Sequence, residues 1–257
     1  MTRPLASVQE AVAAFARGEM LVVIDDEDRE NEGDLILGAQ FATPERMAFM
    51  IRHTSGLVCA AISNARADEL DLPLMVARNT ESQRTAFTVT VDYRHGTTTG
   101  ISAHDRAATT RALVEPATGP DDLARPGHLH VLRARDGGVL KRAGHTEAAL
   151  DLTHLAGISE GGVLCEVVSE DGLTMAKRDE LEAFAERHGL LMMTIADLVR
   201  YRRQTERLVK RVARARVPTE WGEFECFAYQ GVLDGDTHIA FVAGDPAGKE
   251  DVLVRVH

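Results

Sequence analysis

The sequence of 257 residues is poor in cysteine, has an excess of acidic over basic residues and contains no long apolar run. Its three thiols, Cys59, Cys165 and Cys226, are scattered without the spacing of a metal site, which argues against a disulfide framework and favours a reducing cytoplasm. No stretch approaches the roughly 20 apolar residues of a membrane span. Residues 1–20 lack the apolar core of a signal peptide. We therefore expect a cytoplasmic protein without a membrane partner.

Positive charge is in deficit, with 29 basic against 40 acidic residues, a net charge of −11 and a pI of about 5.4. This balance disfavours nucleic acid and anionic membrane surfaces as partners. It does not exclude an anionic small molecule, which needs only a local cluster of arginines. The hydrophobic fraction of 44% is ordinary for a protein with a sizeable core. The length suits one large domain, or one domain with a fragment of another.

Apolar runs and helical spacings alternate along the first 205 residues, which predicts a layered mixed sheet covered by helices, in the α+β (mixed α/β) class. Strands are expected at residues 21–24, 35–37, 57–63, 85–92, 129–133, 163–168 and 190–195. Helices are expected at residues 7–17, 43–54, 65–70, 106–114, 146–156, 178–188 and 195–203.

The last part of the chain has a different character and is treated as a second segment, residues 206–257. Residues 206–216 are strongly basic and are interpreted as a surface helix or a linker. Residues 224–229 and 237–243 are expected to form a new pair of strands. They would either pack on the first domain or be loosely ordered.

The most unusual stretch is the loop after the first expected strand, in the sequence VVIDDEDRENEGD. It carries seven carboxylates and one arginine, Arg29, within residues 25–34. So many carboxylates cannot share a dry interior, because an unpaired buried charge costs several kcal/mol or is neutralised. Some must face water, some must meet arginine, and some can hold a cation. A solvated acidic hairpin explains the stretch equally well, since it lacks the ligand spacing of an EF-hand.

A second stretch, RAGHTE, immediately precedes a predicted helix. Gly144 allows a special backbone angle, and Thr146 is a candidate helix cap. Arg142 beside a helix N-terminus would form an anion site suited to a phosphate. An ordinary capped loop is an alternative for this stretch, and a surface or core histidine is an alternative for His145.

Two further side chains are candidates for proton transfer. Glu166 lies within the apolar run VLCEVV, where burial would favour its protonated form and suit general acid/base work; a solvent-facing glutamate on an edge strand is the alternative. His128 follows a Pro–Gly turn and is either projected for chemistry or simply an exposed loop histidine. The loop TTTGISAHDR offers hydroxyl and N–H groups to an oxygen-rich ligand, which alone is a weak signal.

The order of these motifs is more specific than any one of them. RENEGD, SGLVC, FTVTVD, TTGISAHDR, RPGH, GGVLKRAGHTEAALDL and GVLCE…DGLTMA together resemble 3,4-dihydroxy-2-butanone 4-phosphate synthase over residues 5–203. The remainder resembles the opening of a GTP cyclohydrolase II domain, as in the front part of a bifunctional riboflavin-biosynthesis protein. The resemblance implies a lyase that converts D-ribulose 5-phosphate to L-3,4-dihydroxy-2-butanone 4-phosphate and formate through a metal-stabilised enediolate.

The resemblance also implies roles for individual residues. Mg²⁺ would be held by Glu30 and His145, and the imidazole ligand makes Mn²⁺ a possible substitute. The catalytic residues would be His128, Glu166 and Asp34. The substrate-binding residues would be Arg29, Glu30, Asp34, Arg142, Ala143, Gly144, His145, Thr146 and Glu166. One departure from the family pattern is His130, where a less polar residue is expected.

At the level of the whole molecule, the resemblance implies a three-layer twisted mixed sheet and a homodimer with active sites at its interface. The expected partner is a small sugar phosphate. Cyclohydrolase activity is expected to be absent, because one cysteine after residue 205, Cys226, cannot make a three-cysteine zinc site. A metal-dependent sugar-phosphate aldolase or isomerase, and a non-catalytic scaffold, are the competing hypotheses.

Overall fold

The computed structural model describes residues 5–257, so the first four residues of the expected first domain lie outside the described residues. The chain forms two compact units, and the division falls between Arg202 and Arg203, inside helix α7 (Ile195–Thr205). Within residues 5–257, no helix combines the length and the apolar character of a bilayer-crossing segment.

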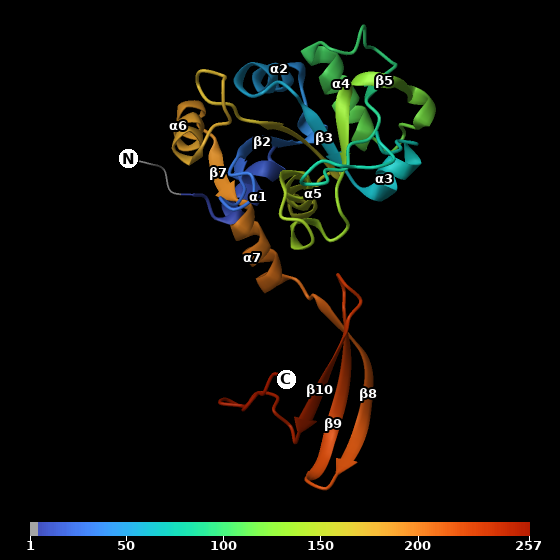
Figure 1. The fold of residues 1–257 in the computed structure, drawn as a ribbon, viewed down its shortest axis with the longest axis vertical. Coiled ribbons are helices and arrows are strands. Elements are labelled where there is room, and N and C mark those ends of the chain that lie inside the picture. The colour runs from blue at the N-terminus through green and yellow to red at the C-terminus, as the bar shows by residue number, and fades with distance from the viewer. Residues whose placement is uncertain (1–4) are drawn as a thin grey trace. The chain divides into compact units, whose positions relative to one another are not determined.

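The first unit is built on a mixed sheet, drawn in Figure 1. Its order is β4-β5-β3-β6-β2-β1-β7. The pairs β1–β7 and β3–β5 are parallel and the other pairs are antiparallel. The strands are β1 (Leu21–Ile24), β2 (Gly33–Gly38), β3 (Cys59–Ile62), β4 (Val91–Tyr93), β5 (Leu123–Arg133), β6 (Gly161–Glu166) and β7 (Leu191–Thr194).

Helices cover both faces of this sheet, which confirms the predicted three-layer mixed architecture. Apolar residues of α1, α5 and α7 pack against one face, and those of α2, α3, α4 and α6 against the other. The further helices are α1 (Val8–Ala16), α2 (Pro44–His53), α3 (Asn64–Glu69), α4 (Ala103–Val114), α5 (His145–Ala156) and α6 (Arg178–His188).

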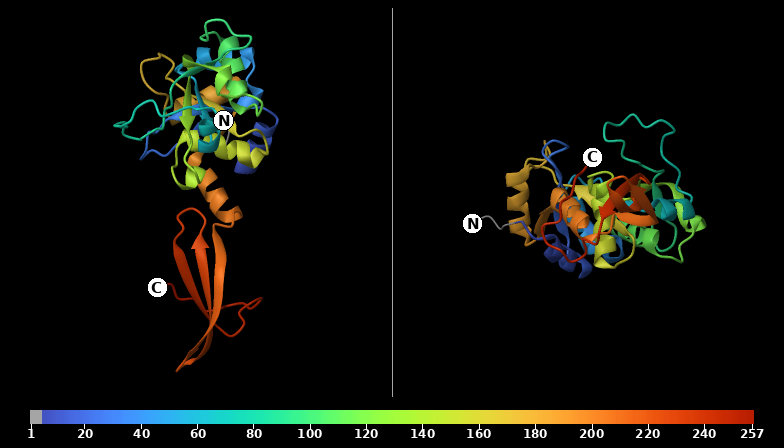
Figure 2. Two further views of the ribbon diagram at one scale, coloured as in Figure 1. Left: turned by 90° about the vertical axis from the view of Figure 1, so that its right-hand side faces the viewer. Right: turned by 90° about the horizontal axis from the view of Figure 1, so that it is seen from below.

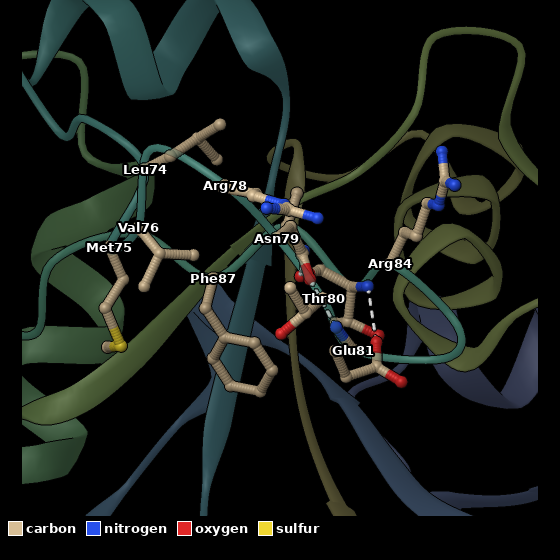
Figure 3. Close-up of a pocket in the computed structure, with 11 residues that line it drawn as sticks. Leu74, Met75, Val76, Arg78, Asn79, Thr80, Glu81, Arg84 and Phe87 are labelled. Carbon is tan, nitrogen blue, oxygen red and sulfur yellow. Dashed lines mark hydrogen bonds between the residues drawn. The ribbon is translucent and has the colours of Figure 1, made fainter.

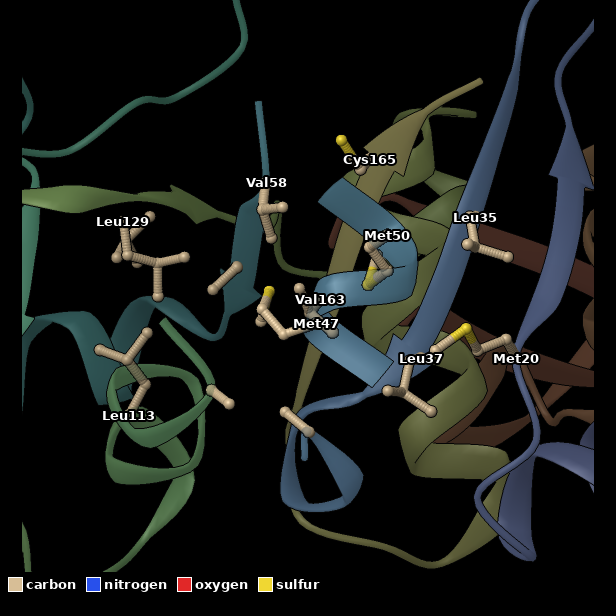
Figure 4. Packing of buried hydrophobic residues seen from close by; sticks show 14 of the residues in the cluster. Met20, Leu35, Leu37, Met47, Met50, Val58, Leu113, Leu129, Val163 and Cys165 are labelled. Carbon is tan, nitrogen blue, oxygen red and sulfur yellow. The ribbon is translucent and has the colours of Figure 1, made fainter. Parts of the chain in front are cut away.

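The two cores follow from the period-two alternation of strand side chains. In β1, Val22 and Ile24 contribute to one hydrophobic cluster, whereas Leu21 and Val23 contribute to the other. Figure 4 shows part of the first cluster, in which Leu35, Leu37 and Val163 of the sheet meet methionines of α2. Because both faces of β1 and β2 are buried, these strands are apolar throughout, and polar groups are confined to the loop between them and to Asp34.

Several predicted elements differ from the structure in extent; the strand predicted at residues 129–133, for example, begins at Leu123. Residues 85–92 were expected to form a strand, but regular pairing is limited to β4, and Phe87 and Thr88 make isolated bridges to Leu132 and Leu74. Helix α4 starts three residues earlier than predicted, at Ala103, because the Ser102 hydroxyl accepts a hydrogen bond from the Asp105 N–H group and caps it.

The second unit contains an antiparallel sheet of order β10-β9-β8, whose strands are β8 (Val209–Thr219), β9 (Gly222–Gly231) and β10 (Thr237–Ala243). Figure 2 shows these strands in two further views. The prediction of a helix or linker at residues 206–216 was wrong. The basic side chains of β8 are accommodated by β9: Arg214 pairs with Glu225, and the guanidinium groups of Arg211 and Arg214 lie 5.5 and 5.6 Å from the Phe227 ring centre.

Candidate active site

A cavity of about 190 Å³ opens where the β1–β2 loop, the end of β6 and the start of α5 converge. These segments are far apart in the sequence and meet because β2 pairs with both β1 and β6. The cavity is lined by Arg29, Glu30, Glu32, Asp34, Cys59, Glu81, Thr85, Phe87, Leu132, Arg142, His145, Thr146, Leu164 and Glu166.

A larger hollow of about 420 Å³ lies next to it under the segment that precedes β4, and the two share Glu81, Thr85 and Phe87. Figure 3 shows its apolar end, formed by Leu74, Val76 and neighbouring side chains, and the hydrogen bonds around Glu81. Among its lining residues there is no histidine and a single carboxylate, Glu81. The smaller cavity is therefore the candidate active site.

Asp25 organises the acidic loop at the mouth of this cavity. Its buried carboxylate accepts hydrogen bonds from the backbone N–H groups of Glu30 and Glu32, at 3.3 and 2.9 Å. The Arg29 guanidinium lies 2.6 Å from Asp25 Oδ2 and also pairs with Glu30. The loop is thus folded around one carboxylate, Asp25, and this places Glu30 at the cavity.

Asp25, Glu30 and His145 form a cluster whose ligand atoms all lie within 4.8 Å of one another. The Nε2 atom of His145 lies 3.1 Å from the Val23 carbonyl oxygen, which makes it the donor to that oxygen and leaves the Nδ1 lone pair facing the cavity. Burial lowers the pKa of His145 to about 4, so the imidazole is neutral at pH 7. Two carboxylates and a neutral imidazole oriented by a backbone carbonyl fit a divalent cation.

Asp34 is a second buried carboxylate of the site. It projects from β2, opposite Val23 of β1 and Glu166 of β6. Its Oδ1 atom lacks a hydrogen-bond partner among the described residues and lies 3.6 Å from His145 Nδ1. Burial raises the pKa of Asp34 well above its usual range, and the neighbouring Glu166 and Glu30 raise it further. A carboxyl group whose pKa is raised in this way is suited to exchanging a proton with a bound substrate.

Glu166 differs from the expectation of a carboxylate buried within an apolar strand. It is the last residue of β6 and only half-buried. Its Oε2 atom accepts a hydrogen bond of 2.9 Å from the Ser55 hydroxyl, and its carbonyl accepts one of 2.8 Å from the Ser55 N–H. The serine fixes the carboxylate while leaving it at the cavity.

Arg142 adds a guanidinium group to the lining of the cavity. Arg142 lies 2.7 Å from Glu147 Oε2 and donates to the Thr85 hydroxyl at 2.9 Å and the Gln83 carbonyl at 3.3 Å. A Cβ atom at Gly144 would approach Arg142 NH1 to 2.4 Å, so a larger residue there would displace this guanidinium from the helix start. Gly144, rather than the expected Thr146, is the N-cap of α5, and it has no side chain to satisfy the first N–H groups.

The predicted site residues are therefore brought together with one exception. Seven of them line the cavity: Arg29, Glu30, Asp34, Arg142, His145, Thr146 and Glu166. Ala143 and Gly144 form the turn that leads into α5. His128 is absent from the lining and instead pairs with Asp92 at the β4–β5 edge of the sheet.

Sequence reasoning missed several residues in or next to the cavity. Asp25 lies next to the lining and stands out in the sequence only as part of an acidic run; its position directly after an apolar strand is the signal that it can be buried. Cys59 was noted only as a thiol, yet it faces the cavity, and burial raises the pKa of that thiol. Phe87 and Thr85 come from a segment that crosses the cavity because of long-range bridges, for which the local sequence holds no signal.

Comparison with known proteins supports the arrangement. Residues 9–201 match the family described as 3,4-dihydroxy-2-butanone 4-phosphate synthase, and residues 210–257 match GTP cyclohydrolase II. The chain is 55% identical over 251 residues to riboflavin biosynthesis protein RibBA of Salinispora arenicola, covering 98% of this chain and 60% of that protein. It is 52% identical over 258 residues to the chloroplastic bifunctional riboflavin biosynthesis protein RIBA 1 of Arabidopsis thaliana, of which it covers 47%. The chain thus spans about half to three fifths of these relatives.

Solved structures agree with the sequence relatives. RibBX of A. baumannii, a two-domain 3,4-dihydroxy-2-butanone 4-phosphate synthase, superposes with a TM-score of 0.84 at 46% identity, covering 94% of this chain and 71% of that one. A synthase in complex with two magnesium ions has a TM-score of 0.76 at 45% identity, covering 78% of this chain and 98% of that one. By sequence and by fold, the chain belongs to the 3,4-dihydroxy-2-butanone 4-phosphate synthase family.

Proposed function

We propose that the chain is a lyase of riboflavin biosynthesis that converts D-ribulose 5-phosphate to L-3,4-dihydroxy-2-butanone 4-phosphate and formate. The observation that carries this is one small cavity that is lined by Arg142 and by two members of the Asp25–Glu30–His145 cluster, Glu30 and His145. A sugar phosphate has vicinal oxygens at one end and a phosphate at the other. The two products together contain all the atoms of the substrate, so the reaction needs no oxidant or reductant.

Arg142 and the start of α5 bind the phosphate in this proposal. The guanidinium is already held by Glu147 and Thr85, so little side-chain entropy is lost when the substrate arrives. The uncapped N–H groups of α5 add donors aligned with the helix dipole. Binding energy from this end then fixes the geometry of the carbon atoms that react.

Glu30 and His145 hold Mg²⁺, and Asp25 is the third protein group able to contribute. Mg²⁺ prefers one or two carboxylates plus water and substrate oxygens, and the imidazole makes Mn²⁺ an acceptable substitute. When bound, the ion supplies a Lewis acid for the oxygens of the sugar. Arg29 keeps Glu30 in place through its contact with Asp25.

Asp34, Glu166 and His128 share the proton transfers of enolisation, dehydration, carbon shift and formate loss. Asp34 is held next to the metal cluster and in cross-strand register with Glu166. Ser55 orients Glu166 toward the cavity. Two carboxyl groups with different burial, one buried and one half-buried, suit opposite acid and base roles.

The proposal includes a homodimer, and it rests on the position of His128. This histidine is a catalytic residue by resemblance, yet it is not in the cavity lining of its own chain, and its side chain is 44% exposed. A second copy that places its β4–β5 edge over the cavity would deliver it. Sedimentation at micromolar concentration tests whether the chain forms a dimer. Mixing His128 variants with active-site variants tests whether one copy supplies His128 to the cavity of the other, because activity should then return in the mixture.

We further propose a cytoplasmic enzyme that uses neither nucleic acid nor membrane as a partner, in line with its charge and its free thiols. The domain boundary is placed at residues 205/206. The second unit is proposed to lack cyclohydrolase turnover, because Cys226 alone cannot supply three thiolate ligands to zinc. Pyrophosphate release from GTP with added Zn²⁺, above a no-protein control, would contradict this.

The assay for the main proposal is formate release from ribulose 5-phosphate by the purified chain with Mg²⁺. Formate together with a four-carbon phosphate is expected. A sugar-phosphate isomerase or aldolase would consume the same substrate without formate, and a scaffold would not consume it.

A further inference from the structure

Helix α5 carries two buried carboxylates, Glu147 and Asp151, one helical turn apart. Residues at this spacing lie on the same face of a helix. Glu147 lies 2.7 Å from the guanidinium of Arg142. Asp151 lies 2.7 Å from the guanidinium of Arg202, on α7. The first pair reaches the cavity through Arg142, whereas within residues 5–257 neither Asp151 nor Arg202 lines it. The second pair therefore needs a different explanation.

The Asp151–Arg202 pair holds the backbone of a tight turn that precedes the substrate-binding residues. Asp151 Oδ2 accepts a hydrogen bond of 2.9 Å from the Val139 N–H. The Arg202 guanidinium donates to the Gly137 carbonyl at 3.0 Å. The Arg202 and Asp151 side chains are 12% and 11% exposed, so water competes little for these contacts. One buried ion pair thus holds the backbone on both sides of Gly138.

Gly138 is the point where the ion pair and the turn meet. Its φ is +61°, in the left-handed region that favours glycine. A Cβ atom there would fall 2.0 Å from Asp151 Oδ1 and 2.6 Å from the Arg202 guanidinium. A side chain at this position would therefore push both charged groups away from the backbone. The glycine lets the ion pair pack directly on the turn.

The backbone of Arg142 is bonded to this same glycine. The Gly138 carbonyl accepts hydrogen bonds from the N–H groups of Lys141 and Arg142, at 2.9 and 3.1 Å. The Arg142 carbonyl in turn accepts one of 2.8 Å from the N–H of Gly144, the N-cap of α5. A shift of Gly138 would therefore move the Arg142 backbone directly.

The helix that supplies Arg202 is itself held firmly. Arg202 is the last residue of the first unit and lies near the end of α7. Ile195 and Leu198 of this helix are buried in the hydrophobic cluster that also contains residues of α5. This packing fixes the helix from which Arg202 extends to Asp151.

We propose that the Asp151–Arg202 pair positions the substrate-binding turn. The pair fixes Gly138 and thereby sets where the Arg142 guanidinium meets the substrate phosphate. The inference rests on the proposed function, in which Arg142 binds that phosphate. Glu147 orients the side chain of Arg142, whereas Arg202 places its backbone. Asp151 and Arg202 are positioning residues, because they act on the substrate only through Arg142.

The first test measures backbone hydrogen exchange by mass spectrometry, without substrate or turnover. In Arg202→Gln, peptides covering residues 138–144 should exchange about tenfold faster than in wild type, because local opening of the turn becomes easier. Peptides from β1 and β2 should be unchanged. Arg203→Gln is the matched control, because this neighbouring residue of α7 is exposed, and it should match wild type throughout. Unchanged exchange of the turn in Arg202→Gln would overturn the proposal, as would an equal acceleration over the whole first unit.

The second test separates positioning from stability. Arg202→Gln takes the arginine away from the buried Asp151 carboxylate, so the double variant Arg202→Gln/Asp151→Asn removes that charge as well. The thermal midpoint of the double variant should return to near that of wild type. Its KM for ribulose 5-phosphate should stay raised by about tenfold, with kcat within about threefold. Arg202→Lys keeps the charge and should recover part of the loss in KM. A wild-type KM in the double variant would overturn the proposal.

The effects of Arg202 and Arg142 should also be coupled. Once Arg142→Ala has removed the guanidinium from the substrate, adding Arg202→Gln should raise KM no further. An independent increase in KM would show that Arg202 does not act through Arg142 and would overturn the inference. A wild-type chain that released no formate would overturn the proposed function, and the exchange experiment, which needs no turnover, would still decide whether the ion pair fixes the turn.

Discussion

Asp34 Oδ1 lies 3.6 Å from His145 Nδ1, and this carboxylate oxygen has no hydrogen-bond partner among the described residues. A buried polar atom without a partner costs about 1–3 kcal/mol. Proteins retain such costs at functional sites, where a ligand supplies the missing partner. The contact joins a residue of β2 to the first residue of α5, and both residues line the cavity.

Asp34→Asn should therefore separate stability from activity. Removing a carboxylate crowded by Glu166 and Glu30 should raise the free energy of unfolding of the metal-free protein by about 1 kcal/mol or more, while kcat falls. Urea unfolding in EDTA and formate release measure the two effects. A variant that is less stable than wild type would show that Asp34 is structural.

Arg142→Ala should raise KM far more than it lowers kcat. Loss of a charge-assisted hydrogen bond to phosphate is worth about 1.5–3 kcal/mol, or roughly 10- to 100-fold in binding. The substitution also removes the ion-pair partner of Glu147, which is buried. The double variant Arg142→Ala/Glu147→Gln, which leaves no unpaired buried charge at Glu147, should therefore be measured alongside it. Unchanged kinetic constants in a folded double variant would take Arg142 out of the substrate site.

Glu166→Gln should abolish turnover and spare substrate binding. The amide keeps the side-chain size but cannot exchange a proton, and the expected loss in kcat is about 10²–10⁴-fold. Glu170→Gln serves as the control, because its side chain is 83% exposed and pairs with Arg187 at the surface. If both variants turned over at similar rates, Glu166 would have a structural role.

Acid should destabilise the metal-free protein through His145. Burial lowers the pKa of this imidazole from 6.5 to about 4, so between these values the unfolded chain binds a proton that the folded protein does not. The contribution of neutral His145 to the free energy of unfolding is therefore fully present above pH 6.5 and is lost as the pH falls to about 4. The total loss is about 3 kcal/mol.

The effect of His145 on the pH dependence of stability is isolated by comparing wild type with His145→Gln, which removes the titrating group. Asp34 works in the opposite direction, because its raised pKa favours the folded state as the pH falls. The free energy of unfolding of wild type minus that of the variant, measured between pH 4 and pH 7, should therefore rise with pH. A flat difference would mean that His145 is not buried as described.

Local patterns in the sequence predicted much of the fold. The apolar run at residues 21–24 and the cap at Thr43 match β1 and α2 closely. In β8, the basic residues suggested a solvated helix, but their partners, Glu225 and Phe227, are on the next strand. A short stretch of sequence that covers one strand does not reveal opposite charges on the neighbouring strand.

The site was predictable as a set of motifs but not as an arrangement. The resemblance gathered Arg29, Glu30 and His145, and the structure places them around one cavity. It could not tell that Asp34 rather than Glu166 is the fully buried carboxylate, because this depends on the β2–β6 register. The pairing of His128 with Asp92 likewise depends on a bulge between β4 and β5.

The most direct test of the account follows uniformly ¹³C-labelled ribulose 5-phosphate by NMR, with the wild-type chain and with His145→Gln, each in Mg²⁺ and in EDTA. Wild type with Mg²⁺ should give formate and a four-carbon ketose phosphate in equal amounts. EDTA or loss of the His145 ligand should stop both products together. Full turnover in EDTA, or consumption of the substrate without formate, would contradict it.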